Sequence, residues 1–159
     1  MIDGASHLKY VVGSGWVLGI PHDWVQIYEN AANYRSPSGG ERIDLYDRAT
    51  IPNCTTIDTC VKSAYNLNIN RGLSANSLQI SDHTVGGFPS KVLRGPNFYY
   101  IFTAANGLIY SLIFQGTTPV IFEYSVIDIN EQIRMQNNLY ELMRYAIRCT
   151  WPYYCVPSR

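Results

Sequence analysis

Most hydrophobic residues of this chain fall in short runs, and several runs alternate apolar and polar positions as half-buried β-strands do. Clusters of Gly, Pro, Asn and Asp separate the runs and indicate turns. The predicted strands span residues 9–12, 16–20, 25–28, 34–36, 41–47, 78–81, 90–93, 98–103, 108–114 and 119–126. The last three runs are almost wholly apolar, so we expect both faces of that part of the sheet to be covered.

The clearest local signal is Asn106-Gly107, which separates two of these apolar runs. This pairing favours the positive backbone angles of a tight hairpin turn. It predicts that residues 98–103 and 108–114 pair as antiparallel strands. Residues 119–126 would then add the third strand of a meander.

A first helix is predicted between the fifth and sixth strands. Thr55-Thr56-Ile57-Asp58 has the form of a capping box, in which Thr55 caps the first amides and Asp58 faces the positive end of the helix dipole. The apolar residues at helical spacing are Ile57, Cys60, Val61 and Ala64. The helix should fade through the Asn-rich residues 66–70 and stop by Gly72.

A second helix is predicted near the C-terminus, where apolar residues recur at helical spacing. They are Ile129, Ile133, Leu139, Leu142, Met143, Ala146 and Ile147. Pro152 should end this helix, because it has no amide hydrogen and clashes with the preceding turn. The order strands, helix, strands, helix predicts an α+β fold: an antiparallel β-sheet, with a meander in its second half, flanked by two main helices. The length of 159 residues fits a single globular domain, residues 1–159.

Four segments of the chain carry a resemblance to a known family. "GWVLGIPHDW" contains a strand and a Pro-x-x-Trp turn, here Pro21 and Trp24, and "VGGFPSKVL" contains a small-residue turn before a strand, here Gly86, Gly87 and Pro89. "NGLIYSLIF" contains a hairpin strand with Tyr110, and "LYELMRYAIRCTW" the closing helix. In this order the segments resemble the PsbP-like superfamily, which includes the extrinsic lumenal protein of photosystem II and a nuclear Ran-binding factor. The resemblance implies a PsbP-like fold and a non-enzymatic binding or assembly module. It does not name a partner, because members of this fold serve unrelated ones.

The composition narrows the classes of partner. Hydrophobic residues make up 47% of the chain, enough for a proper core, and charged residues 15%. With a formal net charge of zero, the chain has no long-range attraction for nucleic acid or an anionic membrane, and we expect neither as a partner. Residues 95–122 carry no charge, but turn residues interrupt them at strand-length intervals, so we predict no transmembrane segment. Residues 1–10 lack a secretory signal, as a mature or trimmed chain also would.

The four cysteines form two C-x5-C pairs, Cys54 with Cys60 and Cys149 with Cys155. Structural zinc sites place cysteines roughly two to four residues apart, and redox motifs have the C-x-x-C form, so this spacing fits neither. Two disulfides are predicted, with the local pairing favoured and a bond between the two helices, for example Cys60 to Cys149, as the alternative. Disulfides place the protein in an oxidising, extracytoplasmic compartment or in a thermophile that keeps disulfides inside the cell.

Two further features are candidates for surface function. Asn53-Cys54-Thr55 has the form of a glycosylation sequon, although Asn53 also fits a simple turn residue. Outward-facing aromatic residues bury contact area at little cost in entropy. The candidate contact residues are Tyr99, Trp151, Tyr153 and Tyr154, with packing of the tail on the sheet as the alternative.

No residues are predicted to be catalytic, cofactor-binding or metal-ligating. His22-Asp23 and Asp82-His83 are acid–imidazole neighbours, but adjacent residues on a strand or turn usually point apart. The sequence therefore predicts a non-catalytic, extracytoplasmic binding or assembly module that meets a protein partner or self-associates. A structural subunit of a surface filament or capsid is the first alternative. A small hydrolase that uses His22 or His83 is the second.

Overall fold

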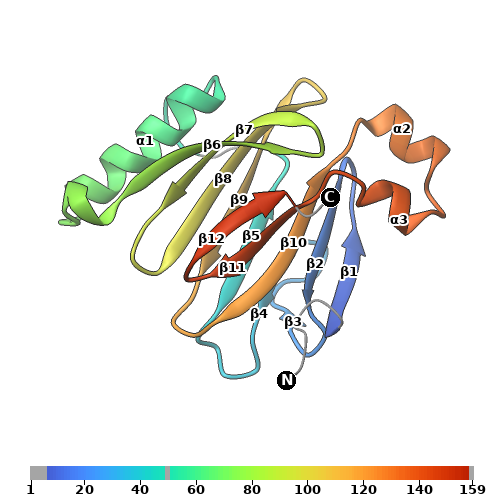
Figure 1. Cartoon of the computed structure of the whole chain (residues 1–159), viewed down its shortest axis with the longest axis horizontal. Helices are drawn as coiled ribbons and strands as arrows, with labels where there is room; N and C mark the ends of the chain where they lie inside the picture. Colours follow the sequence, from blue (N-terminus) through green and yellow to red (C-terminus); the bar gives the residue numbers. More distant parts are fainter. Residues whose placement is uncertain (1–6, 49–50, 158–159) are drawn as a thin grey trace.

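The protein folds into two antiparallel sheets that pack face to face, with helices outside them (Figure 1). The structure, a computed structural model, describes residues 7–48 and 51–157. The α+β class predicted from the sequence is confirmed. The predicted single sheet, however, is divided into two.

The five-stranded sheet has the order β1-β2-β10-β11-β12, and every neighbouring pair is antiparallel. Its strands are β1 (Leu8–Val12), β2 (Trp16–Pro21), β10 (Val120–Val126), β11 (Ile147–Trp151) and β12 (Tyr154–Pro157). The seven-stranded sheet has the order β3-β4-β5-β9-β8-β7-β6 and is also antiparallel. Its strands are β3 (Val25–Gln26), β4 (Ala32–Arg35), β5 (Arg42–Tyr46), β6 (Gln79–Val85), β7 (Phe88–Arg94), β8 (Phe98–Ala105) and β9 (Leu108–Gln115). The helices are α1 (Ile57–Asn70), the short 3-10 helix η2 (Ala75–Ser77), α2 (Ile129–Arg134) and α3 (Leu139–Leu142).

Aromatic side chains from both sheets form the centre of the core. Phe114 of β9 stacks on Phe122 of β10, with ring centroids 5.3 Å apart. It also contacts Trp151 of β11 at 5.6 Å and Trp24, which precedes β3, at 6.4 Å. Each such pair contributes about 0.5–1.5 kcal/mol beyond the area it buries. Phe114 therefore joins the two sheets and fixes their separation.

Helix α1 covers the outer face of the seven-stranded sheet, over β7 and β8. The predicted helix is confirmed, but its cap is one residue later. Thr56, not Thr55, accepts a hydrogen bond from the amide of Thr59, and the hydroxyl of Thr59 accepts one from the amide of Thr56. The helix ends at Asn70, before Gly72 takes a positive φ of 100°.

The hairpin at Asn106-Gly107 is also confirmed. Both residues have positive φ, 56° and 69°, and β8 and β9 pair in register on either side. The side chain of Asn106 donates to the carbonyl oxygen of Ile127 at 2.9 Å and accepts from the amide of Ile129 at 3.0 Å. This turn therefore also holds the end of β10 and the start of α2.

The predicted third strand of the meander is wrong. β10 leaves the sheet of β9 after Gly116 and pairs with β2 and β11 in the other sheet. The meander of the second half is instead β6-β7-β8-β9. An apolar strand fits either sheet equally well, and its partner is set by non-local packing that the local pattern does not record.

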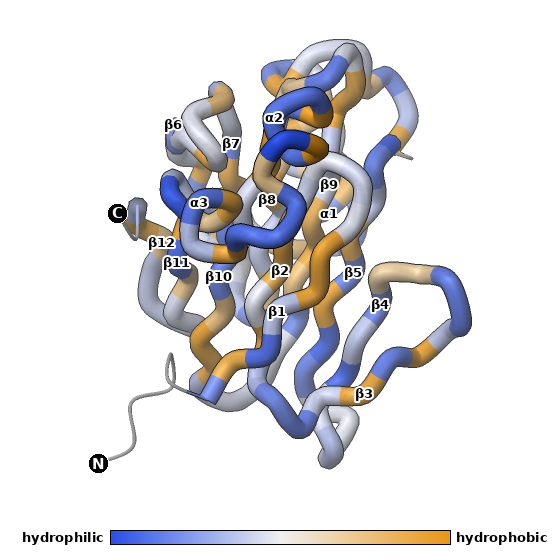
Figure 2. Tube along the Cα trace, turned by 90° about the vertical axis from the view of Figure 1, so that its right-hand side faces the viewer, coloured by the Kyte–Doolittle hydropathy of each residue, from blue (hydrophilic) through white to orange (hydrophobic). Residues whose placement is uncertain are grey.

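The predicted long C-terminal helix is wrong as well. Only α2 and α3 are helical in this region: α2 ends at its C-cap Met135, and Asn138 caps the separate short helix α3, which ends at its C-cap Met143. The buried residues Ile147, Cys149 and Trp151 then alternate with half-buried ones, which is the period of a strand. Pro152 ends no helix: it lies in the turn between β11 and β12. In Figure 2, α2 and α3 lie at the end of the molecule opposite β3, and most of α2 is hydrophilic.

Candidate functional site

The predicted local pairing of the cysteines is confirmed. Cys54–Cys60 links the segment before α1 to its first turn, and Cys149–Cys155 joins directly opposed residues of β11 and β12. The alternative bond between helices is excluded, since both pairs are closed within six residues. The second disulfide connects strands rather than a helix end, and it belongs to the core between the sheets.

The four candidate contact aromatics divide into two groups. Tyr99 and Trp151 are 1% and 3% exposed and pack edge to face with ring centroids 5.1 Å apart, so they are core residues and cannot be contact residues. Burial raises the pKa of Tyr99 to about 12, against a smaller opposing effect of Arg94. Tyr153 and Tyr154 are 58% and 57% exposed on the β11–β12 turn and on β12. They stay candidates for a contact role.

Asn53, the possible glycosylation site, is exposed in the turn before α1 and has a positive φ of 61°. The conformation fits the turn residue that the sequence also allowed, because Asn adopts this region more readily than most residues. Its modification stays a prediction.

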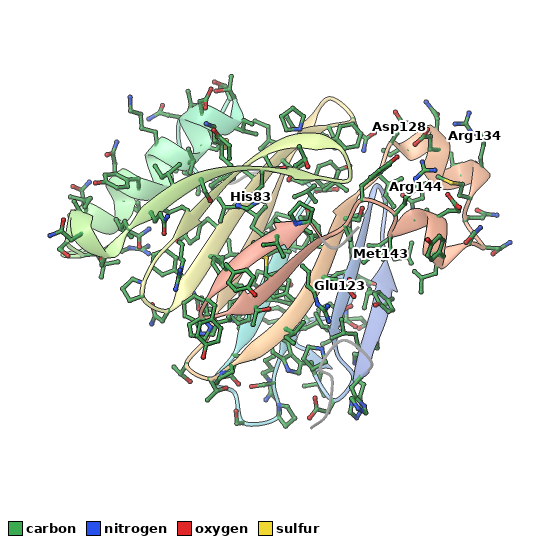
Figure 3. All side chains as sticks on the ribbon, in the orientation of Figure 1. His83, Glu123, Asp128, Arg134, Met143 and Arg144 are labelled. Carbon is green, nitrogen blue, oxygen red and sulfur yellow. A yellow bond between two sulfur atoms is a disulfide. The ribbon has the colours of Figure 1, made fainter. Side chains whose placement is uncertain are left out.

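His83 lies on β6, on the side that faces β12 (Figure 3). Its Nε2 is 3.1 Å from the hydroxyl oxygen of Ser81, which lies on the same face of the strand. Burial lowers the pKa of His83, and the smaller opposing effect of Asp82 does not compensate. Asp82 points to the other face, where it pairs with Lys91. The pattern of adjacent acid and imidazole therefore does not form an oriented pair.

A large pocket lies among the turns that follow β2, β4 and β9. It has a volume of about 810 Å³, within the range of roughly 300–1,000 Å³ typical of ligand pockets. We call it the end pocket. Residues from three turns form most of its wall: residues 21–24 at the end of β2 and before β3, residues within 36–41 between β4 and β5, and residues 118–119 before β10. β3 and β4, which flank two of these turns, lie at the lower edge of Figure 1.

The wall of the end pocket exposes mostly apolar surface, although many of its residues carry a polar group. The apolar lining residues are Pro21, Trp24, Pro37, Pro119, Val120 and Ile121. The polar lining residues are His7, His22, Asp23, Ser36, Ser38, Glu41, Thr118 and Thr150. A concave apolar surface with a small number of convergent polar groups is the usual form of a small-molecule site.

Hydrogen bonds fix the Ser36–Glu41 turn. The amide of Ser36 donates to the carbonyl of Glu41 at 3.0 Å, and the amide of Gly39 donates to the carbonyl of Ser36 at 3.0 Å. The hydroxyl of Ser36 also accepts from the amide of Glu41 at 3.2 Å. Gly39 has a positive φ of 80°, which glycine adopts without strain. The turn is thus held before any ligand arrives.

Glu41 is the one strongly buried charge in this wall, with 5% of its surface exposed. Its Oε2 accepts from the hydroxyl of Thr117 at 3.2 Å and from the amide of Thr117 at 3.5 Å. Burial by itself raises the pKa of Glu41, but hydrogen bonds from Thr118, Ser36 and Thr117 outweigh it, and the pKa lies below its ordinary value of 4.5. The carboxyl is therefore ionised at neutral pH.

The two histidines that line the pocket, His7 and His22, are both exposed. His22 Nδ1 is 3.2 Å from the carbonyl oxygen of His7, and the two rings are 6.0 Å apart. His22 and Asp23 were candidates from the sequence, whereas Glu41 and Trp24 were not singled out as site residues. Glu41 begins a predicted strand and Trp24 follows a predicted turn. A local pattern does not distinguish such positions from ordinary surface residues, so the sequence contains no signal for either.

Within residues 7–48 and 51–157, no group of three or more His, Cys, Asp or Glu side chains is placed to hold a metal ion. No helix in that part of the chain has both the length and the hydrophobicity to cross a membrane. The chain matches no known protein-family model, and no curated protein is significantly similar to it in sequence.

Proposed function

We propose that this chain is a non-catalytic binding module that works outside the cytoplasm, with the end pocket as its ligand site. The observation that carries the proposal is the pocket itself: about 810 Å³, apolar in its body, with walls fixed by the Ser36–Glu41 turn. A site that exists before binding loses less entropy when a ligand enters, which favours affinity.

The two disulfides support the extracytoplasmic part of the proposal. Such bonds persist in oxidising compartments and are rare in the cytosol of mesophiles. The resemblance of the sequence to the PsbP-like superfamily supports the same non-enzymatic class. Pro21 and Trp24, two of the residues that carry this resemblance, lie in the wall of the end pocket.

A fragment screen followed by 1H–15N NMR tests the proposal. We expect some members of a mixed library to shift amide resonances of the three turns around the pocket. Ser38 is exposed on the pocket wall, so Ser38→Tyr should fill part of the space and weaken these fragments. Ser74→Tyr is the matched control, because Ser74 is an exposed serine before η2 and does not line the pocket. Shifts confined to other surfaces, or equal effects of both variants, would contradict the assignment.

A structural subunit that self-associates is a second candidate, favoured by the edge strand β12. Tyr154 and Val156 are exposed on this strand, and Tyr153 on the turn before it. An edge strand with exposed apolar side chains can pair with another chain. Light scattering across a concentration series separates the candidates: growth of oligomers that Tyr154→Lys abolishes would favour the subunit, and a strict monomer would favour the binding module.

A small hydrolase is the third candidate, and its best location is the Ser81–His83 contact. General-base catalysis needs an orienting group for the imidazole, and the adjacent Asp82 is engaged by Lys91. We expect a panel of ester, phosphate and glycoside substrates to give no turnover. Turnover that His83→Ala or His22→Ala abolishes would overturn the non-catalytic proposal.

A further inference from the structure

Within the described part of the chain, no ion pair neutralises the buried negative charge of Glu41. The ion pairs found in residues 7–48 and 51–157 use other carboxylates. Arg42, the next residue in the chain, points away and binds Asp44 through two nitrogens at 2.8 and 2.9 Å. A buried carboxylate is costly unless it is paired or hydrogen-bonded, and at Glu41 hydrogen bonds from Ser36, Thr117 and Thr118 take the place of a cation.

The hydrogen bonds that Glu41 accepts from Thr117 are long for an ionised group. Bonds to a carboxylate are usually about 2.5–2.7 Å from a hydroxyl and about 2.7–2.9 Å from a cationic nitrogen. The Thr117 contacts are 3.2 and 3.5 Å. Together with the hydrogen bonds from Ser36 and Thr118 they hold the carboxylate in place, but all these donors are neutral, so the negative charge stays available to a cation in the pocket.

The charged side chains of the pocket wall are acidic as far as the structure describes it. Among the lining residues within 7–48 and 51–157, Asp23 and Glu41 are acidic, none is Lys or Arg, and the imidazoles are those of His7 and His22. Lys9 lies near, but its ammonium donates to the backbone carbonyl of Trp24, and Lys9 does not line the pocket. A cation that enters the pocket therefore finds two carboxylates and no competing protein cation in the lining. Because Glu41 is only 5% exposed, the attraction at its carboxylate is stronger than between the same charges in water.

From these observations we propose that the end pocket recognises an organic cation, a primary amine or guanidinium with an apolar body, through its charge pairing with Glu41. This inference rests on the proposed function, since it names the ligand class of the same site. The apolar body would lie against the proline and aliphatic part of the wall, for example Pro119 and Val120. The chemistry fits a free small amine and a basic side chain of a peptide alike.

Three small probes of one shape test the charge directly: benzylamine, benzyl alcohol and benzoate, each titrated into the 15N-labelled protein. We expect benzylamine to bind in the millimolar range at the pocket, at least tenfold tighter than either of the others. A fourth probe, lysine capped at both ends, distinguishes the two sources. If capped lysine binds at the same pocket as benzylamine, the natural ligand class includes basic peptides. If only benzylamine binds, the site takes small free amines.

Glu41→Gln should weaken benzylamine at least tenfold and change benzyl alcohol less than twofold, because the amide keeps the shape and loses the charge. Glu123→Gln is the matched control. Glu123 is also 5% exposed, accepts a hydrogen bond from Tyr10 at 2.8 Å, and lies on β10 outside the pocket lining (Figure 3). The comparison of the three probes on the unmodified protein does not depend on either variant folding.

The outcomes separate this inference from the proposed function. If benzyl alcohol or benzoate binds as tightly as benzylamine at the pocket, or if Glu41→Gln changes nothing, the pocket binds ligands but not by charge, and the inference is overturned alone. If the broad fragment screen finds pocket ligands while benzylamine gives no shift, the inference fails again and the proposed function stands. If neither the screen nor the probes shift the pocket resonances, both are overturned.

Discussion

The two disulfides provide an internal comparison of what such a bond contributes. Both close loops with a sequence separation of six. The loop-closure estimate therefore gives the same stabilisation for each, about 2 kcal/mol at 25 °C. Their surroundings differ. Cys149 and Cys155 are both buried between the sheets, 0% and 7% exposed, whereas Cys60 is buried and Cys54 is only half-buried.

We predict that Cys149→Ala/Cys155→Ala is more destabilising than Cys54→Ala/Cys60→Ala. Each replacement removes a sulfur atom, and deleting a buried group about the size of a methylene costs roughly 1 kcal/mol. The first double variant loses two such buried atoms and the second loses one. The expected losses are thus about 4 and about 3 kcal/mol, the common part being the loop-closure contribution.

Urea unfolding followed by tryptophan fluorescence measures both losses under non-reducing conditions, with the other disulfide intact. The difference of about 1 kcal/mol should also appear as roughly 2–4 °C in Tm for a chain of this size. Equal m-values for the two variants would show that the comparison concerns stability rather than the compactness of the unfolded chain. Equal losses, or a larger loss for the Cys54–Cys60 variant, would refute the argument that burial distinguishes the two bonds.

Three further predictions follow from single residues. Gly86→Ala should abolish folding or cost several kcal/mol, because an added Cβ would lie 1.6 Å from the carbonyl oxygen of Val126. Gly87→Ala should cost only about 1 kcal/mol of backbone strain, because Gly87 has a φ of 85° and nothing lies within 4 Å of the added Cβ. Thermal melts of the two variants test this difference. Phe114→Ala should cost about 3–5 kcal/mol in urea unfolding, because its ring is wholly buried between the sheets; a cost under 1 kcal/mol would contradict its central place in the core. Because the pKa of Glu41 is lowered from 4.5 in the folded state, its ionisation stabilises the protein above that pH and the contribution is lost as pH falls through the folded value. Glu41→Gln should therefore lose less stability than the unmodified protein between pH 7 and pH 3, and an identical loss would show that the carboxyl does not contribute.

Local signals in the sequence predicted the local parts of the fold. Asn106-Gly107 specified a turn whose backbone angles few other residues adopt, and the hairpin of β8 and β9 followed. Helix α1 was predicted because its cap, apolar face and final glycine all agree. The sequence predicted Thr55 as the cap, whereas Thr56 is the cap in the structure. Two adjacent threonines offer the same hydroxyl group, so the local pattern does not decide between them.

Non-local choices were not predictable in the same way. Leu139, Leu142, Met143 and Ala146 have helical spacing, and most of them do bury against Val17 in one cluster, but on short helices and the turns after them. The alternation of Ile147, Cys149 and Trp151 indicates a strand. It covers only five residues and directly follows residues with helical spacing, so the sequence pattern predicts it as part of the helix. The pairing of β10 with β2, about a hundred residues earlier in the chain, leaves no local trace.

The end pocket was missed for the same physical reason. Its wall consists of turn residues from three connections, and each connection looks like an ordinary surface turn in the sequence. Loops held on a rigid scaffold are where binding residues concentrate, because strands fix the ends of a loop while its side chains stay free to face a ligand. Here the scaffold is the pair of sheets joined through Phe114, and the loops meet only because β4, β5 and β9 belong to one sheet and β2 and β10 to the other.

Glu41 is ionised at neutral pH although it is buried, because hydrogen bonds outweigh the effect of burial on its pKa. A carboxyl buried among apolar groups alone would keep its proton and offer a hydrogen-bond donor instead of a charge. Hydrogen bonds from Ser36, Thr117 and Thr118 prevent this by favouring the ionised form. These neutral donors stabilise the negative charge but do not neutralise it. A lysine or arginine at the same place would neutralise it. The wall of the end pocket therefore holds an ionised carboxylate with its net charge uncompensated, which is the condition that selective binding of a cation requires.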